Sequence, residues 1–164
     1  MKKLTIFSAA ALFSAASLAH THNSHNWDAY QTLADDINNT VATAPLEDLA
    51  KKSEKLTKLS TMLLPAFMKK HEICTDYLKA ALSAADSLTS LSLDDIEKDY
   101  HADGKLPPVK SASCYHAKDL LVHPATMAVI AKTKADSKET REQIEHELEE
   151  VLEHFSQVKV AAGL

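Results

Sequence analysis

Apolar residues recur at steps of three and four along most of the chain, which is the spacing of one buried helix face. The first such stretch runs from Trp27 to Val41. Ser24 or Asn26 stands directly before it, and both residue types are preferred at a helix N-cap. The pattern therefore predicts a first amphipathic helix over these residues.

A second stretch begins at Pro45, which suits the first turn of a helix, and its apolar positions keep their phase as far as Leu88. Pro65 lies inside this stretch, where it removes one helical hydrogen bond. Because the phase is unchanged across Pro65, the pattern predicts one long helix that is kinked there. A break into two helices near Pro65 is the alternative.

Ser92, followed by Asp95 three residues later, has the form of a capping box. It predicts a short helix that ends near His101, with Gly104 as its stop. The paired prolines of the next segment, residues 105–113, cannot continue a helix, so this segment is a linker.

A further helix is predicted over about residues 111–132, with Pro124 as a candidate kink. The last helix begins after Asp136 or Ser137 as N-cap and keeps an apolar face as far as Val158. Helices of these lengths with short connections predict an all-α protein, an antiparallel bundle of four to five helices.

Residues 1–19 have the three parts of a secretory signal peptide. Lys2 and Lys3 form the basic start, an apolar stretch continues to about Ala16, and Ala19 is the small residue before the expected cleavage site. A membrane anchor is the alternative, but the apolar stretch is shorter than the roughly 20 residues that a spanning helix needs. We therefore expect export and cleavage after Ala19.

Residues 20–164 are then expected to form a single helical-bundle domain, in the periplasm or secreted. Loss of the leader removes two lysines, so the formal net charge falls from −5 to −7. A chain this acidic gives no reason to expect nucleic acid as a partner or membrane insertion after the leader is removed. The chain has only two glycines, which excludes the glycine-rich phosphate loops of nucleotide enzymes.

Cys74 and Cys114 both lie in the part expected to be exported, where oxidising conditions favour a disulfide. We expect that bridge, with a reactive thiol or a thiolate metal pair as the alternative. The chain has no CxxC string, which excludes thioredoxin-like redox chemistry and c-type haem attachment.

Histidine is the one compositional excess, with nine residues, and three of them closely follow the expected cleavage site. Cleavage after Ala19 would give a new terminus of sequence His20-Thr21-His22, with a free amine, two amides and a histidine in third position. These four nitrogens suit a square-planar ion such as Cu(II) or Ni(II). A polar terminal segment without a metal is the alternative.

His71 lies on or beside the apolar face of the second stretch, and His116 and His123 stand seven residues apart on a later helix. If Cys74 is bonded to Cys114 and their helices are antiparallel, His71 and His116 are neighbours. His116 and His123 would lie about 10.5 Å apart along the helix, too far to bind one small ion together. The sequence predicts a transition-metal or haem site in the region of these three histidines.

Met127 or Met68 would be a second ligand of such a site, and Glu72, Asp119 and Tyr115 would orient the histidine rings. The alternative is that the histidines are ordinary core residues, hydrogen-bonded by their neighbours. The methionines otherwise fill the core, and the chain lacks the Glu-x-x-His strings of di-iron bundles.

Glu142, His146, Glu150 and His154 follow one another at four-residue steps along the last helix. They stand on the face opposite Leu148, so the pattern predicts a solvated face and not a zinc site.

The chain carries no nucleophile or metalloprotease motif, so we expect a protein that is not an enzyme. Two functions are consistent with the sequence. The first is a non-catalytic carrier or sensor that binds a transition metal or haem. The second is a cofactor-free module whose acidic surface binds another protein of the cell envelope.

Overall fold

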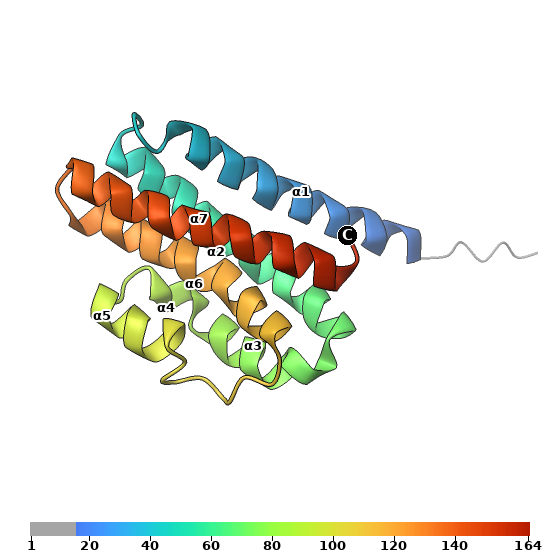
Figure 1. Ribbon diagram of the computed structural model, residues 1–164. Coiled ribbons are helices and arrows are strands. Elements are labelled where there is room, and N and C mark those ends of the chain that lie inside the picture. Colours follow the sequence, from blue (N-terminus) through green and yellow to red (C-terminus); the bar gives the residue numbers. More distant parts are fainter. Residues whose placement is uncertain (1–15) are drawn as a thin grey trace, which may run out of the picture.

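The computed structural model describes the backbone of residues 16–164 and the side chains from His25 onward (Figure 1). Every regular element in this part of the chain is helical. In chain order they are α1 (Ala16–Thr40), α2 (Leu46–Lys70), the 3-10 turn η1 (Glu72–Cys74), α3 (Thr75–Ser83), α4 (Ala85–Leu88), α5 (Leu93–Ile96), the π turn η2 (Glu97–His101), α6 (Ala112–Thr133) and α7 (Lys138–Ala162).

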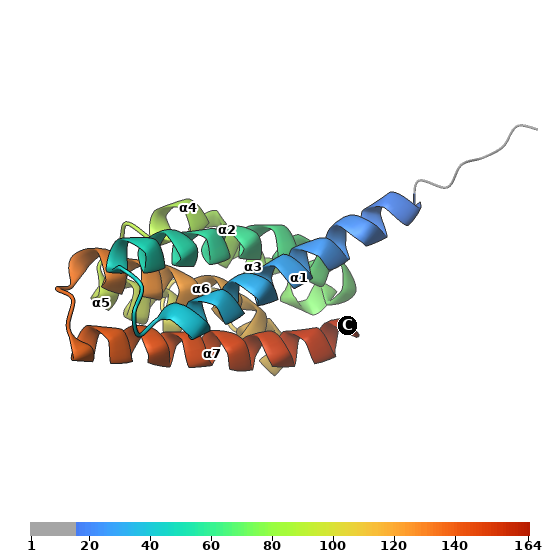
Figure 2. The same cartoon turned by 90° about the horizontal axis from the view of Figure 1, so that it is seen from above.

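The four long helices, α1, α2, α6 and α7, form the body of the molecule. Each of them runs antiparallel to the long helix before it in the chain (Figures 1 and 2). Helix α6 packs against both α2 and α7, and α1 packs against α2 and α7. The short helices α3, α4 and α5 lie along the side of α6 (Figure 1). This architecture confirms the predicted all-α bundle.

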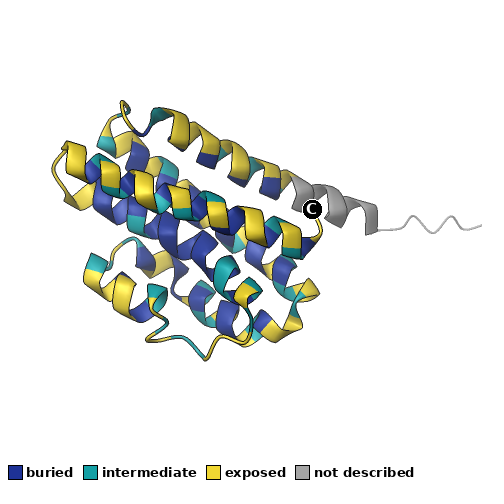
Figure 3. Cartoon of the chain, viewed as in Figure 1, coloured by how far each residue is buried: buried dark blue, intermediate teal, exposed yellow. Residues whose placement is uncertain are grey.

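Helix α6 lies at the centre of the fold and is buried on nearly all of its surface (Figure 3). Pro124 continues the helix but has no N–H to donate to the carbonyl of Leu120, four residues earlier. That carbonyl accepts hydrogen bonds from the Tyr30 hydroxyl, at 2.9 Å, and from the Ser60 hydroxyl. The proline expected to mark a kink therefore frees an acceptor that joins α1, α2 and α6 in the core.

The predicted helix boundaries in the second half of the chain are confirmed. The hydroxyl of Ser92 accepts a hydrogen bond from the Asp95 N–H at 3.1 Å where α5 begins. Ser137 caps α7 in the same way. After η2, a Cβ at Gly104 would collide with the carbonyl oxygen of Lys98, so the chain can pass this close only at a glycine.

The predicted second helix is wrong beyond residue 70. Helix α2 passes through Pro65 without a break, and Pro65 itself is exposed. The helix ends at Lys70, and His71 leaves the helical conformation with φ −124° and ψ 69°. Helices α3 and α4 then replace the expected continuation to Leu88. The first helix also differs, since α1 begins before the predicted cap.

Cys74 and Cys114 form the predicted disulfide, which joins η1 to the first turn of α6 across 40 residues. Among the helices described, none combines the length and the apolar character that crossing a bilayer requires. The predicted signal peptide, residues 1–19, and the predicted copper ligands His20 and His22 lie outside the residues whose side chains are described.

Candidate metal centre

A cluster of ionisable side chains lies inside the molecule where α6, α7 and η2 meet. Several of these side chains are buried, although each carries a group that water would otherwise solvate. The polar cluster, as we call it, consists of His101, Lys118, Asp119, His123, Glu150 and His154.

Asp119 is a fully buried residue of α6, and neither of its carboxylate oxygens accepts a hydrogen bond. Lys118 Nζ lies 2.9 Å from Oδ1, which is an ion-pair distance but lacks hydrogen-bond geometry. Burial raises the pKa of Asp119, and the positive charge of Lys118 opposes that shift. A buried carboxylate with free lone pairs is costly unless a further cation or donor completes it.

His123 is only 3% exposed and lies one turn further along α6. Its Nδ1 lies 2.7 Å from Oε2 of Glu147 on α7, and its Nε2 has no partner. An ionised carboxylate only accepts hydrogen bonds, so this contact places a proton on Nδ1, and in the neutral ring Nε2 then carries a free lone pair. An imidazole oriented by a carboxylate in this way has the arrangement found in metal-binding histidines.

His154 is buried on α7 and stacks on His123, with ring centroids 5.2 Å apart. Its Nδ1 lies 2.7 Å from Nδ1 of His116. Its Nε2 lies 3.7 Å from Oδ2 of Asp119 and 3.6 Å from Oε2 of Glu150. Burial, followed by the neighbouring His123 and His116, lowers the pKa of His154 to about 3. The ring is therefore neutral near neutral pH, which is the form that binds a metal ion.

His101 reaches the cluster from η2, and its ring packs edge-on against His123 at a centroid distance of 5.0 Å. Its Nδ1 lies 3.0 Å from Oε2 of Glu97, four residues earlier. In each of the three histidines of the cluster, Nδ1 thus lies within 3.0 Å of a neighbouring side chain, and in His123 the other ring nitrogen has no hydrogen-bond partner.

The ligand atoms fall into two sets, each with two histidines and one carboxylate. One set is His101, Asp119 and His123, the other is His123, Glu150 and His154, and within each set the atoms lie within 4.8 Å of one another. Four ligands about 2.1 Å from a zinc ion lie about 3.4 Å apart, so side-chain rotation would close each set around an ion. His123 belongs to both sets, which makes it the centre of the candidate site.

The structure does not bring His71 to His116. His71 Nε2 lies 3.1 Å from the carbonyl oxygen of Ala161, and its ring stacks on Phe67. His116 instead faces His154, seven residues and about 10 Å before Ala161 along α7. The expected pair assumed an unbroken helix up to the disulfide, but η1 interrupts the helix there. Of the three histidines predicted as ligands, only His123 belongs to one of the two candidate sets, while His116 contacts His154, a member of the second set.

The expected solvated face on α7 is wrong for its last two members. Glu142 and His146 are exposed, but Glu150 is half-buried and His154 is buried against α6. Because α7 contacts both α1 and α6, its buried face is wide enough to include Glu150 and His154 at its edge.

A repeated spacing marks the site in the sequence. On two consecutive helices, three ligand-type residues are separated by three and then by four positions, which places them on one helix face. Either triplet alone is common on a solvated helix. Two triplets on neighbouring antiparallel helices meet along one seam and indicate a site. The triplets are His116, Asp119 and His123 on α6, and Glu147, Glu150 and His154 on α7.

Of the other residues predicted to take part in the metal site, one contacts the polar cluster and the rest do not. Tyr115 packs edge-on against His154 at 5.7 Å, and burial, with Asp119 nearby, raises the pKa of Tyr115 to about 12. Met127 and Met68 belong to the apolar core. The side chain of Glu72 is exposed and belongs to neither ligand set.

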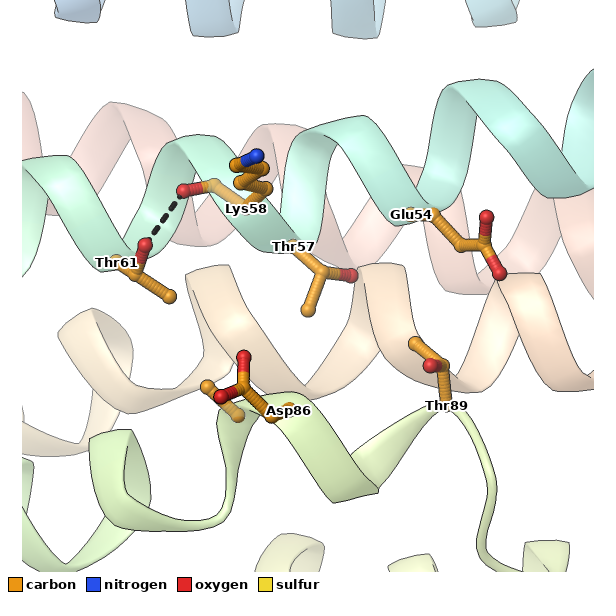
Figure 4. Close-up of a pocket in the computed structure, with 7 residues that line it drawn as sticks. Glu54, Thr57, Lys58, Thr61, Asp86 and Thr89 are labelled. Carbon is orange, nitrogen blue, oxygen red and sulfur yellow. Dashed lines mark hydrogen bonds between the residues drawn. The ribbon is translucent and has the colours of Figure 1, made fainter.

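A surface pocket between α2 and α4 contrasts with the polar cluster (Figure 4). Figure 4 shows Thr57 and Thr61 of α2 opposite Asp86 and Thr89. Both threonines of α2 donate to carbonyl oxygens of their own helix, at 3.0 and 2.7 Å. The side chains that line this pocket include no buried polar atom without a partner, so we place the candidate site in the polar cluster.

Comparisons with protein-family models, with curated proteins and with solved structures find no match to this chain. The chemistry of the polar cluster is therefore the basis on which a function can be assigned.

Proposed function

We propose that the protein binds one divalent transition-metal ion in the polar cluster and acts as a non-catalytic metal carrier or sensor. The observation that supports this best is a pair of buried groups at the centre of the cluster that have no hydrogen-bond partner, the Asp119 carboxylate and Nε2 of His123. Buried polar groups in folded proteins nearly always have a partner. A cation between these two groups would supply one to both.

The donor atoms narrow the choice of ion. The cluster offers imidazole nitrogens and carboxylate oxygens, while Cys74 and Cys114 are bonded to each other. Nitrogen and oxygen donors suit Zn(II), Fe(II), Ni(II) and Cu(II), whereas Cu(I) prefers sulfur. Haem fits the cluster poorly, because the His123 and His154 rings stack 5.2 Å apart and leave no gap for a porphyrin.

The charges around the cluster favour a dication. Asp119 and Glu150 supply one carboxylate to each ligand set. Lys118 brings one positive charge, and Asp103 Oδ1, 3.3 Å from Lys118 Nζ, compensates it. One carboxylate therefore remains in each set to balance the charge of a bound ion, which lowers the cost of burying that charge.

Titration of metal-free protein with Zn(II), together with elemental analysis of protein purified from its own compartment, tests this function. We expect one ion per chain, lost in the Asp119→Asn variant and kept in Glu145→Gln, which changes an exposed carboxylate on the same bundle. A variant with His20, His22 and His25 replaced by alanine should also keep the ion. A colourless protein that takes up no ion would contradict the proposal and favour the cofactor-free module that binds an envelope protein.

We further propose that the protein is exported to the periplasm or beyond. The signal-peptide features of residues 1–19 and the Cys74–Cys114 disulfide support an oxidising compartment. Intact mass spectrometry, with and without reduction, should find a chain that begins at His20 and has no free thiol. A retained leader, or alkylation of Cys74 before reduction, would contradict this expectation.

A further inference from the structure

Lys118 is fully buried, which is rare for a lysine unless its charge has a partner. The ammonium donates hydrogen bonds to two backbone carbonyl oxygens of η2, those of Tyr100 at 2.9 Å and His101 at 3.0 Å. It also lies 2.9 Å from Oδ1 of Asp119 and 3.3 Å from Oδ1 of Asp103. One side chain of α6 thus contacts both the metal-ligand carboxylate and the turn that bears a metal-ligand histidine.

The turn η2 continues directly from the short helix α5 and is not part of the four long helices, so its place in the fold is set by contacts such as those with α6. The last carbonyls of any helical turn lack partners within it, and a cation at that end is favourable. Lys118 supplies both the hydrogen-bond donors and the positive charge. Because the His101 carbonyl is one of its acceptors, Lys118 also fixes the backbone from which the His101 ring reaches His123.

We propose that Lys118 is the positioning residue of this site, and that it fastens η2 to α6 so that His101 completes the first ligand set. The proposal rests on the proposed metal-binding function and deepens it. It assigns to the site one ligand from outside the α6–α7 pair, and it assigns to Lys118 the placing of that ligand.

Charge repulsion alone predicts the opposite effect of removing Lys118. An ammonium 2.9 Å from Asp119 repels an incoming dication, so a lysine with no positioning role would weaken metal binding. Its replacement would then tighten binding. A positioning role predicts weaker binding after replacement, and the direction of the change therefore separates the two.

A double-mutant cycle on Zn(II) affinity tests the proposal, with Lys118→Met, His101→Ala and the combined variant measured by competition with a chromophoric chelator. We expect each single variant to bind Zn(II) about 10- to 100-fold more weakly and the combined variant to bind no more weakly than either. The Co(II)-loaded Lys118→Met protein should show the absorption spectrum of Co(II)-loaded His101→Ala, because both lack the same nitrogen ligand. Lys98→Met is the matched control, since Lys98 is an exposed lysine of η2 itself, and it should bind as the parent does.

Unchanged or tighter binding in Lys118→Met, or losses that multiply in the combined variant, would overturn the proposal. Lys118→Arg keeps the charge and the N–H donors, so it should retain the parent spectrum. If Lys118→Met does not fold, hydrogen exchange on the parent decides. Zn(II) should slow exchange of the amides of residues 97–106 in the parent and not in His101→Ala, and equal exchange in both would refute the role of η2.

Failure of this proposal can be told from failure of the proposed function. A parent protein that binds no Zn(II) removes the metal function itself. A parent that binds one Zn(II) while His101→Ala binds it equally well keeps the function and removes only His101 and Lys118 from it.

Discussion

His71 and His123 differ in what their ring nitrogens contact, and that difference separates an ordinary histidine from a candidate ligand. Both lie beside apolar faces, and the sequence alone predicts both as metal ligands. His71 is half-buried, its Nε2 contacts the Ala161 carbonyl, and its ring stacks on Phe67. His123 is buried, with Nδ1 against Glu147 and nothing against Nε2. The buried ring nitrogen without a hydrogen-bond partner, and not the position on an apolar face, marks the candidate site.

The same contrast separates the buried polar groups of α2 from those of α6. Ser53 and Thr57 are buried on α2, and each hydroxyl donates to a carbonyl of its own helix. A short hydroxyl side chain can do this because it carries a proton and reaches back one turn. The Asp119 carboxylate has no proton to give when ionised, so its own helix cannot satisfy it.

The largest expected effect is the difference in Zn(II) affinity between variants at His123 and at His71. His123→Ala should weaken Zn(II) binding by about 1000-fold, or about 4 kcal/mol, because His123 belongs to both ligand sets. His71→Ala should bind Zn(II) as the parent does. Isothermal titration, or competition with a chelator where binding is tight, measures both. Equal losses in the two variants would mean that the site lies elsewhere.

The Cys74–Cys114 disulfide should contribute to the stability of the fold but not to Zn(II) binding. Cys114→Ser should lower the free energy of unfolding by about 2 to 5 kcal/mol, because the bridge closes a loop of 40 residues. The proposed ligands lie on α6, α7 and η2 and not on η1, so Zn(II) affinity should be unchanged where the variant is folded. Urea unfolding followed by Zn(II) titration checks both. A Cys114→Ser protein as stable as the parent would contradict the first expectation, and one that folds but loses Zn(II) would contradict the second.

The fold follows from the sequence wherever local signals agree. Periodicity gives the long helices, and Ser92, Ser137 and Gly104 act locally enough to be recognised. The end of α2 at Lys70 does not follow, because no proline or glycine stands there and the apolar phase continues. Packing and the disulfide, which lie beyond the local sequence, set that boundary.

The site follows from the sequence only in part. Asp119 and His123 stand on a helix whose other faces are all buried, so periodicity could not show which face carried the polar seam. His154 belongs to a four-residue ladder that looks solvated, and only the pairing of α6 with α7 buries it. His101 comes from a turn, and Lys118 brings it to the site across 17 residues of sequence.

The smallest expected effects concern the free energy of unfolding of the metal-free protein, which His71→Ala and Asp119→Asn should change in opposite directions. In a chelating buffer, His71→Ala should lower the free energy of unfolding by about 1 kcal/mol, because it removes the contact with the Ala161 carbonyl and the stacking on Phe67. Asp119→Asn should instead raise it by about 1 kcal/mol. The amide keeps the shape of the carboxylate but removes a buried charge, and Lys118 retains Asp103 and its two carbonyl partners.

Added Zn(II) should make the parent more stable than Asp119→Asn, the reverse of their order without metal. The parent gains stability in proportion to the logarithm of free Zn(II) once the metal exceeds its dissociation constant, whereas a variant without the ion gains nothing. Thermal melts with and without Zn(II) give both orders in one experiment. If Asp119→Asn is the less stable protein in chelator as well, Asp119 stabilises the fold through Lys118 alone. The buried carboxylate would then be a structural ion pair, as ordinary in its role as His71.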